Sequence, residues 1–262
     1  MRKLRPVRVW RGLVQVVALA DPTPYFAARR LSARVPEVQL VSIYRRANAS
    51  TLLDALGPAL RAGFDSTLWA LDGEEATLAP WTVGSGPGRR FQLANRLFSR
   101  ADAPWRVLID DDVRFHHGDI VDLIRFASAL ELDIAQPAHT LGSNVSHSFT
   151  RRMPFVVGRE TSFVEIGPVV AFGPRALPHV LPLPETGMGW GVEAEWAELE
   201  RTAGLRLGIV DAVSIRHLEQ AGSAYAASEE LEAAQARLRA AGLAGWGDLQ
   251  RTHRRRGLCS LR

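Results

Sequence analysis

Short runs of apolar residues alternate with amphipathic stretches through the first half of the chain. The runs Val38–Tyr44, Ser66–Leu71 and Trp105–Ile109 combine β-branched, aromatic and aliphatic residues and predict buried strands. Between them, Thr51–Ala62 and Arg89–Arg100 carry apolar residues at helical spacing and predict helices. An order of strand, helix, strand, helix, strand predicts a parallel sheet whose strands end along one edge.

The second half of the chain has a less regular pattern. It predicts a helix over Gly118–Leu130, a strand over Ile134–Pro137, an interrupted strand within Ser162–Phe172, a helix over Val192–Thr202, a strand over Leu207–Val213 and a helix over Ser228–Ala241. We expect residues 85–88 to form a loop and residues 116–117 a polar turn. The prediction is an α/β domain over residues 38–220, with a mostly parallel Rossmann-like sheet, helices on both faces and a mixed second half. Residues 1–37 are then a basic N-terminal extension, and residues 221–262 a C-terminal helix with a basic tail.

The composition is that of a globular protein with a sizeable core, because 47% of the 262 residues are hydrophobic. The single cysteine, Cys259, excludes a disulfide within the chain and a cysteine-based zinc site. This fits a reducing compartment, so we expect a cytoplasmic protein. No apolar run reaches the roughly 18 residues that a membrane span needs.

The net charge of +4 gathers at the two ends of the chain, which are rich in arginine. Basic ends attract anionic partners, but they also simply raise solubility. Trp10, Leu13, Val14 and Val17 can share one helical face, which favours a basic amphipathic helix over a signal peptide. Such a helix lies on a membrane surface or packs on the body of the protein, so a peripheral membrane contact stays open.

Three consecutive aspartates, Asp110, Asp111 and Asp112, follow the strand predicted to end at Ile109. Without a partner, these charges repel and raise one another's pKa values. A divalent cation removes the repulsion and prefers carboxylate oxygen, and open α/β sheets bind ligands beyond the carboxyl ends of their strands. The triplet therefore predicts a metal site with a bound phosphate, against the alternative of a solvated turn or a helix cap.

Other polar residues fall at the same predicted edge. Asp72 follows the second strand and could bind a base or ribose, although Asp-Gly is also a common turn. Arg89 and Arg90 open a helix after a glycine-containing loop, where backbone N–H and guanidinium groups attract phosphate; an ordinary loop is the alternative. His217 follows the last predicted strand and would complete an oxygen and nitrogen ligand set, with residues 116–117 as alternative histidines.

A further candidate for chemistry is the segment Gly189–Glu195. Its glycines let the backbone approach a ligand, and Trp190 offers a flat face on which a sugar ring could stack. Glu193 could accept a proton from a hydroxyl nucleophile. The alternative is that Trp190 belongs to the core and Glu193 is a first-turn carboxylate favoured by the helix dipole.

In their order along the chain, these motifs resemble nucleotide-sugar-dependent glycosyltransferases of the A-type fold. The resemblance rests on Val-Ser-Ile-Tyr-Arg-Arg-Ala-Asn (41–48), Gly-Arg-Arg-Phe-Gln-Leu-Ala-Asn-Arg (88–96), Val-Leu-Ile-Asp-Asp-Asp-Val (107–113) and Gly-Trp-Gly-Val-Glu (189–193). The sequence resembles still more closely an uncharacterised glycosyltransferase-like family, marked also by Gln-Pro (136–137), Phe-Val-Glu-Ile (163–166) and Val-Asp (210–211) followed by His217.

This resemblance implies a role for each matching residue. Asp110 and Asp112 would help to bind Mn2+ or Mg2+ and the donor diphosphate, with His217 as a further metal ligand. The resemblance would place Tyr44, Arg45 and Asp72 around the nucleotide. From the residues themselves we also expect Asp111, Arg89 and Arg90 to bind the donor and Trp190 to contact the acceptor. The resemblance implies Glu193 as the catalytic base or as an acceptor-binding group. Because the family's Gly-Gly-Glu-Asp string is Gly-Val-Glu-Ala-Glu here, Glu195 is the alternative base, and a different mechanism stays open.

Together these features predict a metal-dependent glycosyltransferase. It would move a sugar from a nucleotide-diphosphate sugar to a hydroxyl of a carbohydrate or lipid-linked acceptor, with no nucleic-acid partner. Two alternatives use the same residues: a metal-dependent phosphohydrolase or nucleotidyltransferase, and a non-catalytic relative that binds carbohydrate.

Overall fold

The fold is known from a computed structural model, which describes residues 6–31, 34–185, 188–220 and 227–261. The first five residues of the basic extension, and residues 221–226 and Arg262 of the C-terminal segment, lie outside the described residues. The strands are β1 (Val38–Tyr44), β2 (Asp65–Ala70), β3 (Thr82–Ser85), β4 (Trp105–Asp110), β5 (Val113–His117), β6 (Ile134–His139), β7 (Gly158–Thr161), β8 (Val169–Phe172), β9 (Leu207–His217) and β10 (Thr252–Arg256). The α-helices are α1 (Pro6–Ala20), α2 (Thr23–Arg30), α3 (Ala49–Arg61), α4 (Arg90–Phe98), α5 (Ile120–Ala129), α6 (Leu177–Val180), α7 (Val192–Ala203) and α8 (Ala227–Ala240), and the short 3-10 helices are η1 (Arg46–Asn48), η2 (Ala79–Trp81), η3 (Ser148–Thr150), η4 (Trp246–Asp248) and η5 (Leu258–Ser260).

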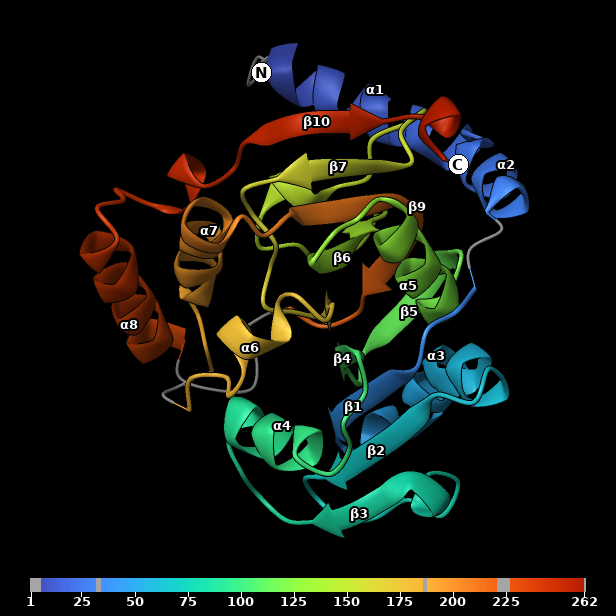
Figure 1. The fold of residues 1–262 in the computed structure, drawn as a ribbon, viewed down its shortest axis with the longest axis vertical. Helices are drawn as coiled ribbons and strands as arrows, with labels where there is room; N and C mark the ends of the chain where they lie inside the picture. The colour runs from blue at the N-terminus through green and yellow to red at the C-terminus, as the bar shows by residue number, and fades with distance from the viewer. Residues whose placement is uncertain (1–5, 32–33, 186–187, 221–226, 262) are drawn as a thin grey trace, which may run out of the picture.

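One mixed sheet runs through the molecule in the order β10-β7-β9-β6-β8-β4-β1-β2-β3, and β5 pairs with β9 (Figure 1). The neighbours of β1 are both parallel to it: Tyr44 lies opposite Ala70 of β2, and Ile43 lies opposite Asp110 of β4. The carboxyl ends of these strands therefore meet at one edge. β8 runs antiparallel between β4 and β6, so the second half of the sheet is mixed. The expected α/β fold class is confirmed.

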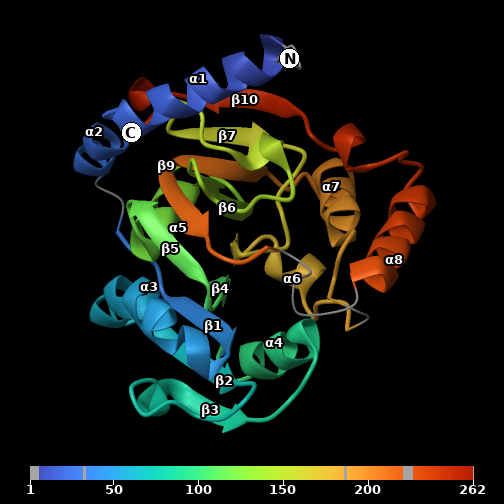
Figure 2. The same cartoon turned by 180° about the vertical axis from the view of Figure 1, so that it is seen from behind.

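Helices cover both faces of the sheet because the buried strands carry apolar side chains on both sides (Figures 1 and 2). In β1, Val38 and Leu40 face the core shared with α2, α3 and α5, whereas Val41 and Ile43 face the core shared with α4, α6 and α7. Successive side chains of a strand point to opposite faces, which explains this division. α8 packs outside α7.

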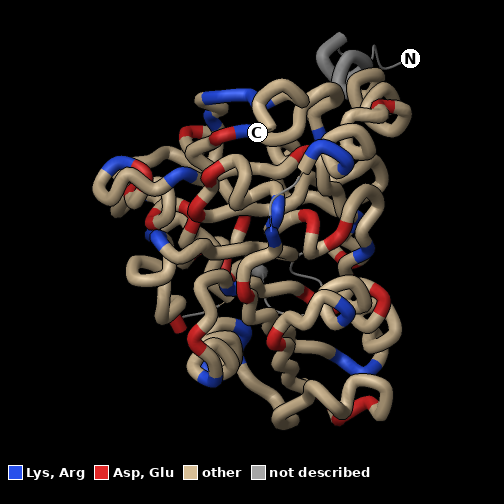
Figure 3. The backbone as a smooth tube through the Cα atoms, turned by 45° about the vertical axis from the view of Figure 1, so that its right-hand side comes forward, with Lys and Arg blue, Asp and Glu red and all other residues tan. Residues whose placement is uncertain are grey.

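The two end segments also pack on this sheet. β10 pairs antiparallel with β7 as an edge strand, and its arginines, Arg254–Arg256, form a basic strip near the C-terminus (Figure 3). α1 packs on the body through Gln15 and Ala18, which are buried, but it leaves Leu13 and Val16 more than half exposed. No helix in the described part of the chain is long and apolar enough to cross a bilayer.

Two sequence expectations about local structure were wrong. Residues 116–117 belong to β5, where His117 pairs with Ser214 of β9, and do not form a polar turn. Ser85 ends β3, which extends the parallel part of the sheet beside β2, so the expected loop begins only after it.

Candidate functional site

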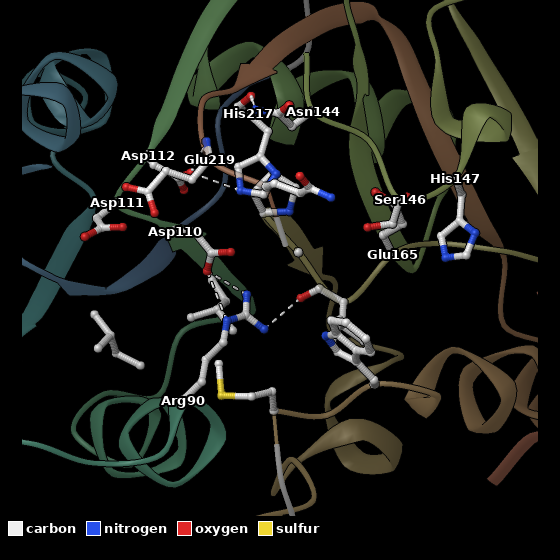
Figure 4. A pocket seen from close by; sticks show the side chains of 18 of the residues that line it. Arg90, Asp110, Asp111, Asp112, Asn144, Ser146, His147, Glu165, His217 and Glu219 are labelled. Carbon is white, nitrogen blue, oxygen red and sulfur yellow. Dashed lines mark hydrogen bonds and ion pairs between the residues drawn. The ribbon is translucent and has the colours of Figure 1, made fainter. Parts of the chain in front are cut away.

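A pocket of about 700 Å³ opens at the carboxyl ends of β1 and β4. The aspartate triplet (Asp110–Asp112), Arg90 and His217 line one side of it, which we name the donor side after the role that the sequence predicts for these residues. Glu165, Ser146 and His147 lie across from the triplet (Figure 4). Glu193, Trp190 and Trp246 also line the pocket. We name the part formed by Glu165, His147, Glu193 and the two tryptophans the acceptor side, after the roles predicted for Trp190 and Glu193.

Asp112 and His217 are brought together by the pairing of β5 with β9. Val113 lies opposite His217, and the Leu218 N–H donates to the Asp112 carbonyl at 3.0 Å. The His217 Nε2 atom then stands 3.1 Å from Asp112 Oδ2, which also accepts the Glu219 N–H at 2.8 Å. Burial alone would raise the pKa of Asp112 and lower that of His217, but their mutual attraction outweighs burial. The pKa of Asp112 is lowered and that of His217 is raised.

Asp111 fastens the end of β4 to the end of β1. Its Oδ2 atom accepts the Arg45 backbone N–H at 2.7 Å, and its Oδ1 atom lies 3.3 Å from the Arg45 guanidinium. Arg45 also pairs with Glu219 at 3.0 Å. Burial raises the pKa of Asp111 even though Arg45 opposes the shift. Asp111 is therefore already held by protein groups, and the Arg45 guanidinium is shared between two carboxylates.

Asp110 pairs with Arg90, the first residue of α4. Two guanidinium nitrogens of Arg90 lie 2.8 and 3.0 Å from Asp110 Oδ1, and a third donates to the Ile166 carbonyl at 3.0 Å. A Cβ atom at Gly167 would stand 2.8 Å from Arg90 Nη2 and 3.1 Å from Asp110 Oδ2. The absence of a side chain at Gly167 therefore provides the space in which the Arg90–Asp110 ion pair lies.

Glu193 lies in the first turn of α7, where the left-handed Gly191 (φ 88°) starts the helix. Its side chain is buried, and its Oε2 atom has no hydrogen-bond partner in the described structure. Burial, reinforced by the negative charge of Glu165, raises the pKa of Glu193 to about 7. Glu195, two residues later, forms an exposed ion pair with Arg237 of α8 and does not line the pocket. The geometry therefore favours Glu193 over Glu195 as a proton acceptor.

Other residues expected at the donor site lie outside the pocket lining. Tyr44 is fully buried, and its hydroxyl is 3.0 Å from Thr82 Oγ1. Asp72 accepts the Arg46 backbone N–H at 2.8 Å, as a turn residue does. Arg89 precedes α4 and is exposed. Arg45, Arg90 and Trp190 are the expected ligand-contacting residues that reach the pocket beside the triplet.

Sequence reasoning missed three residues of the acceptor side: Glu165, His147 and Trp246. Glu165 is buried, its Oε2 atom lies 3.2 Å from His139 Nε2, and its backbone N–H donates to Gln136 Oε1 at 2.6 Å. A charged residue inside the apolar run 163–166 was the available signal. The positions of His147 and Trp246 had no such signal, because long loops carry them to the pocket.

The donor set fits a divalent cation only in part. Among the described residues, no group of three or more His, Cys, Asp or Glu side chains is arranged to hold a metal. Asp112 and His217 offer one oxygen and one nitrogen ligand, with Asp112 Oδ2 3.1 Å from His217 Nε2. Cations bound with nucleotides commonly use one or two protein ligands and complete their coordination with phosphate and water. The pair is consistent with that kind of site.

Comparison with models of known protein families finds no match, and no curated protein matches the chain. Among solved structures, one similar protein is GalNAc-T7, whose crystal structure contains UDP, GalNAc and Mn2+. The two folds agree with a TM-score of 0.56 at 9% sequence identity. The chain has a glycosyltransferase-like A-type fold. The match covers 82% of this chain and 50% of GalNAc-T7, so the chain spans about half the length of that neighbour, and the likeness concerns the fold alone.

Proposed function

We propose that the protein transfers a sugar from a nucleoside-diphosphate sugar to an acceptor hydroxyl with the help of a divalent cation. One observation carries the proposal: a single pocket combines the Asp112–His217 pair at the strand ends with the buried carboxyl of Glu193, whose Oε2 atom has no partner in the described structure. The Asp112–His217 pair can bind a cation that carries a diphosphate, and the Glu193 carboxyl can accept the proton of a hydroxyl nucleophile.

On the donor side, Asp112 and His217 would hold the cation, which when bound would neutralise charge on the departing diphosphate. The guanidinium groups of Arg45 and Arg90 line the same side and add positive charge for phosphate oxygens. Arg90 is oriented by Asp110 and the Ile166 carbonyl, so its position does not depend on a ligand.

On the other side, Glu193 would act as the general base. As the acceptor oxygen bonds to the anomeric carbon, the bond from that carbon to the diphosphate oxygen breaks, and the hydroxyl proton passes to Glu193. A base is most effective when its pKa is close to the working pH. The pKa of about 7 that burial gives Glu193 meets this condition.

Calorimetric titration with nucleoside diphosphates and their sugars, with and without Mn2+, tests the donor half of the proposal. Asp112→Asn removes one charge from the Asp112–His217 pair and should abolish Mn2+-dependent binding. Asp102→Asn is the matched control, because the Asp102 side chain is fully exposed before β4. Undiminished metal-dependent binding and transfer by Asp112→Asn would contradict the proposal, and products in which water or a nucleotide accepts the transferred group would favour a hydrolase or nucleotidyltransferase.

A further inference from the structure

The acceptor side of the pocket holds a second carboxyl group, Glu165, to which the proposed transfer reaction assigns no role. Only 6% of Glu165 is exposed, yet it lines the pocket. It belongs to the irregular segment between β7 and β8, and it faces the pocket across from the aspartate triplet (Figure 4).

A chain of buried hydrogen bonds fixes the Glu165 carboxylate. Ser143 Oγ accepts the His217 backbone N–H at 2.9 Å and lies 2.8 Å from His139 Nδ1. If the Ser143 hydroxyl donates to Nδ1, the Nε2–H of His139 points at Glu165 Oε2, 3.2 Å away. This tautomer leaves Glu165 as a pure hydrogen-bond acceptor, oriented before any ligand arrives.

Two further polar atoms of the pocket residues, Glu193 Oε2 and Trp246 Nε1, are buried without a well-formed hydrogen bond in the described structure. They face each other, because the Trp246 indole N–H is close enough to the Glu193 carboxyl to oppose the rise of its pKa. Glu193 Oε2 can accept a hydrogen bond when the carboxyl is ionised, and Trp246 Nε1 can donate one. An unsatisfied buried polar atom costs about 1–3 kcal/mol, so a ligand that pairs with both would recover that cost. Trp246 is held in place by His147, with ring centroids 5.5 Å apart.

The charges and the apolar lining restrict the chemistry of the ligand. The Lys and Arg residues among the described lining are Arg45 and Arg90, which hold the donor-side aspartates Asp111 and Asp110. A phosphate or carboxylate next to Glu165 would therefore be repelled by that carboxylate, with no described Lys or Arg beside it to offset the repulsion. Neutral hydroxyl groups can donate to both carboxyl groups, and Trp190 and Trp246 offer apolar faces. A sugar ring combines neutral hydroxyls with an apolar face.

We propose that Glu165, Glu193 and the Trp246 indole N–H form the acceptor subsite and that it binds a neutral saccharide. The inference rests on the proposed function and names the acceptor class of that same site. Glu165 accepts a hydrogen bond from a hydroxyl next to the reacting one, the Trp246 N–H donates to a ring or hydroxyl oxygen, and Glu193 faces the reacting hydroxyl. Glu165 is thus a positioning residue for the acceptor.

Saturation-transfer NMR with the full chain tests the subsite without donor or metal. The probes are cellobiose, maltose, lactose and chitobiose, each at millimolar concentration. At least one should receive saturation from the protein, and Glu165→Gln should weaken its binding about tenfold, as expected for a hydrogen bond to a charged group. Trp246→Phe keeps an aromatic ring and removes only the donor, and it should weaken binding at least about threefold. Glu198→Gln, an exposed carboxylate of α7, is the matched control and should leave binding unchanged.

The outcomes separate this inference from the proposed function. Binding of no disaccharide, or binding unaffected by either pocket variant when both retain the wild-type melting temperature, would overturn it, as would preference for a Ser- or Thr-containing peptide. Saccharide binding that depends on Glu165 without any sugar transfer would support the subsite and contradict the transferase. In an active enzyme, Glu165→Gln should raise the acceptor KM and leave the donor KM unchanged.

Discussion

Glu165 and Glu193 line the same pocket but differ in what surrounds their carboxyl groups. His139 and Thr150 hydrogen-bond to Glu165, whereas one oxygen of Glu193 is buried without a partner. Where neighbouring carboxyls have such different surroundings, they commonly divide the work of a reaction. Glu165 suits orientation of a ligand, and Glu193 suits reversible gain of a proton.

The rate of transfer should depend on pH through Glu193. A general base must be ionised, so kcat should rise as the pH increases through about 7, the raised pKa of Glu193. Glu193→Gln cannot accept a proton and should lose about 10²–10⁴-fold in kcat with little change in donor KM. Steady-state kinetics between pH 5.5 and 9 measure both effects. A Glu193→Gln enzyme with the wild-type rate and pH profile would remove Glu193 from the mechanism.

The same carboxyl should make folding stability depend on pH. Its pKa is about 7 in the folded protein against an ordinary value of 4.5, so between these pH values the folded protein keeps a proton that the unfolded chain releases. The free energy of unfolding therefore falls as the pH rises through this range, by up to about 3 kcal/mol from this group. Glu193→Gln should be more stable than the wild type at pH 8 and comparable at pH 4.5, as measured by urea denaturation. A stability difference independent of pH would refute the assignment.

Sequence reasoning found the parts of the site that lie next to strand ends in the chain. Asp112 follows a recognisable buried strand and His217 ends another, so their meeting at one edge could be expected. Tyr44 also ends a strand, but because side chains alternate between the two faces of a strand, its side chain points into the core. Whether a strand-end residue faces the ligand depends on one residue of register, which the apolar pattern of β1 does not reveal, because both its faces are buried.

At the scale of elements, residues 188–191, which precede α7, lie in contact with both α4 and α8. Met188 N–H donates to Glu230 of α8 at 2.8 Å. At Gly189, a Cβ atom would stand 2.0 Å from the Phe91 ring of α4. At Gly191, it would stand 2.9 Å from the Ala234 Cα atom of α8. Close approach of two helices to this loop sets the position of Trp190 and Glu193.

Substitution of Gly191 should show this close approach. Gly191→Ala adds a methyl group against the α8 backbone and strains a left-handed residue. Gly204→Ala strains a left-handed residue at the other end of α7 with nothing within 4 Å of the new atom. The control should lose about 1–2 kcal/mol of unfolding free energy, and Gly191→Ala should lose more and release α8. Urea denaturation and hydrogen exchange of α8 provide the measurement, and equal losses would show that α8 does not press on the loop.

The regular elements could be predicted to different degrees, for physical reasons. β1 matched its predicted bounds because it is almost entirely buried and five of its seven residues are apolar: Val38, Leu40, Val41, Ile43 and Tyr44. β5 was missed because only Val113 of its five residues is buried. β10 was missed because its sequence, Thr-His-Arg-Arg-Arg, has no apolar residue. Its place in the sheet comes from pairing with β7, a contact between distant parts of the chain.

At the scale of the whole molecule, a buried ion pair fixes the N-terminal helices to the sheet. Arg152 is 1% exposed and lies 2.6 Å from Asp21, which follows α1. It also donates to the Asp211 carbonyl of β9 at 3.0 Å and to the Ala18 carbonyl. The Phe155 N–H adds a bond to Asp21 at 2.8 Å. One side chain thus joins the end of α1 to the second half of the sheet.

Removal of that side chain should be strongly destabilising. Arg152→Ala leaves the Asp21 carboxylate buried without its cation and should cost about 3–5 kcal/mol of unfolding free energy. Arg201→Ala is the control, because its ion pair with Glu198 is exposed and such pairs contribute about 0–1 kcal/mol. Urea denaturation gives both values, and hydrogen exchange over residues 12–30 shows whether α1 and α2 detach. Equal stability of the two variants would refute the role of Arg152.

The pocket takes side chains from Ile43 to Trp246, and this spread has a consequence for biosynthesis. The ribosome synthesises the parallel strands next to the triplet early. Leu231 and Trp246, which form the opposite wall, follow about two hundred residues after Ile43. A nascent chain therefore contains the aspartate triplet well before the residues of the opposite wall have been synthesised, so it cannot yet form the complete ligand pocket. Premature termination before Trp246 would yield a product that contains the aspartate triplet but lacks β10 and the Trp246 wall of the pocket.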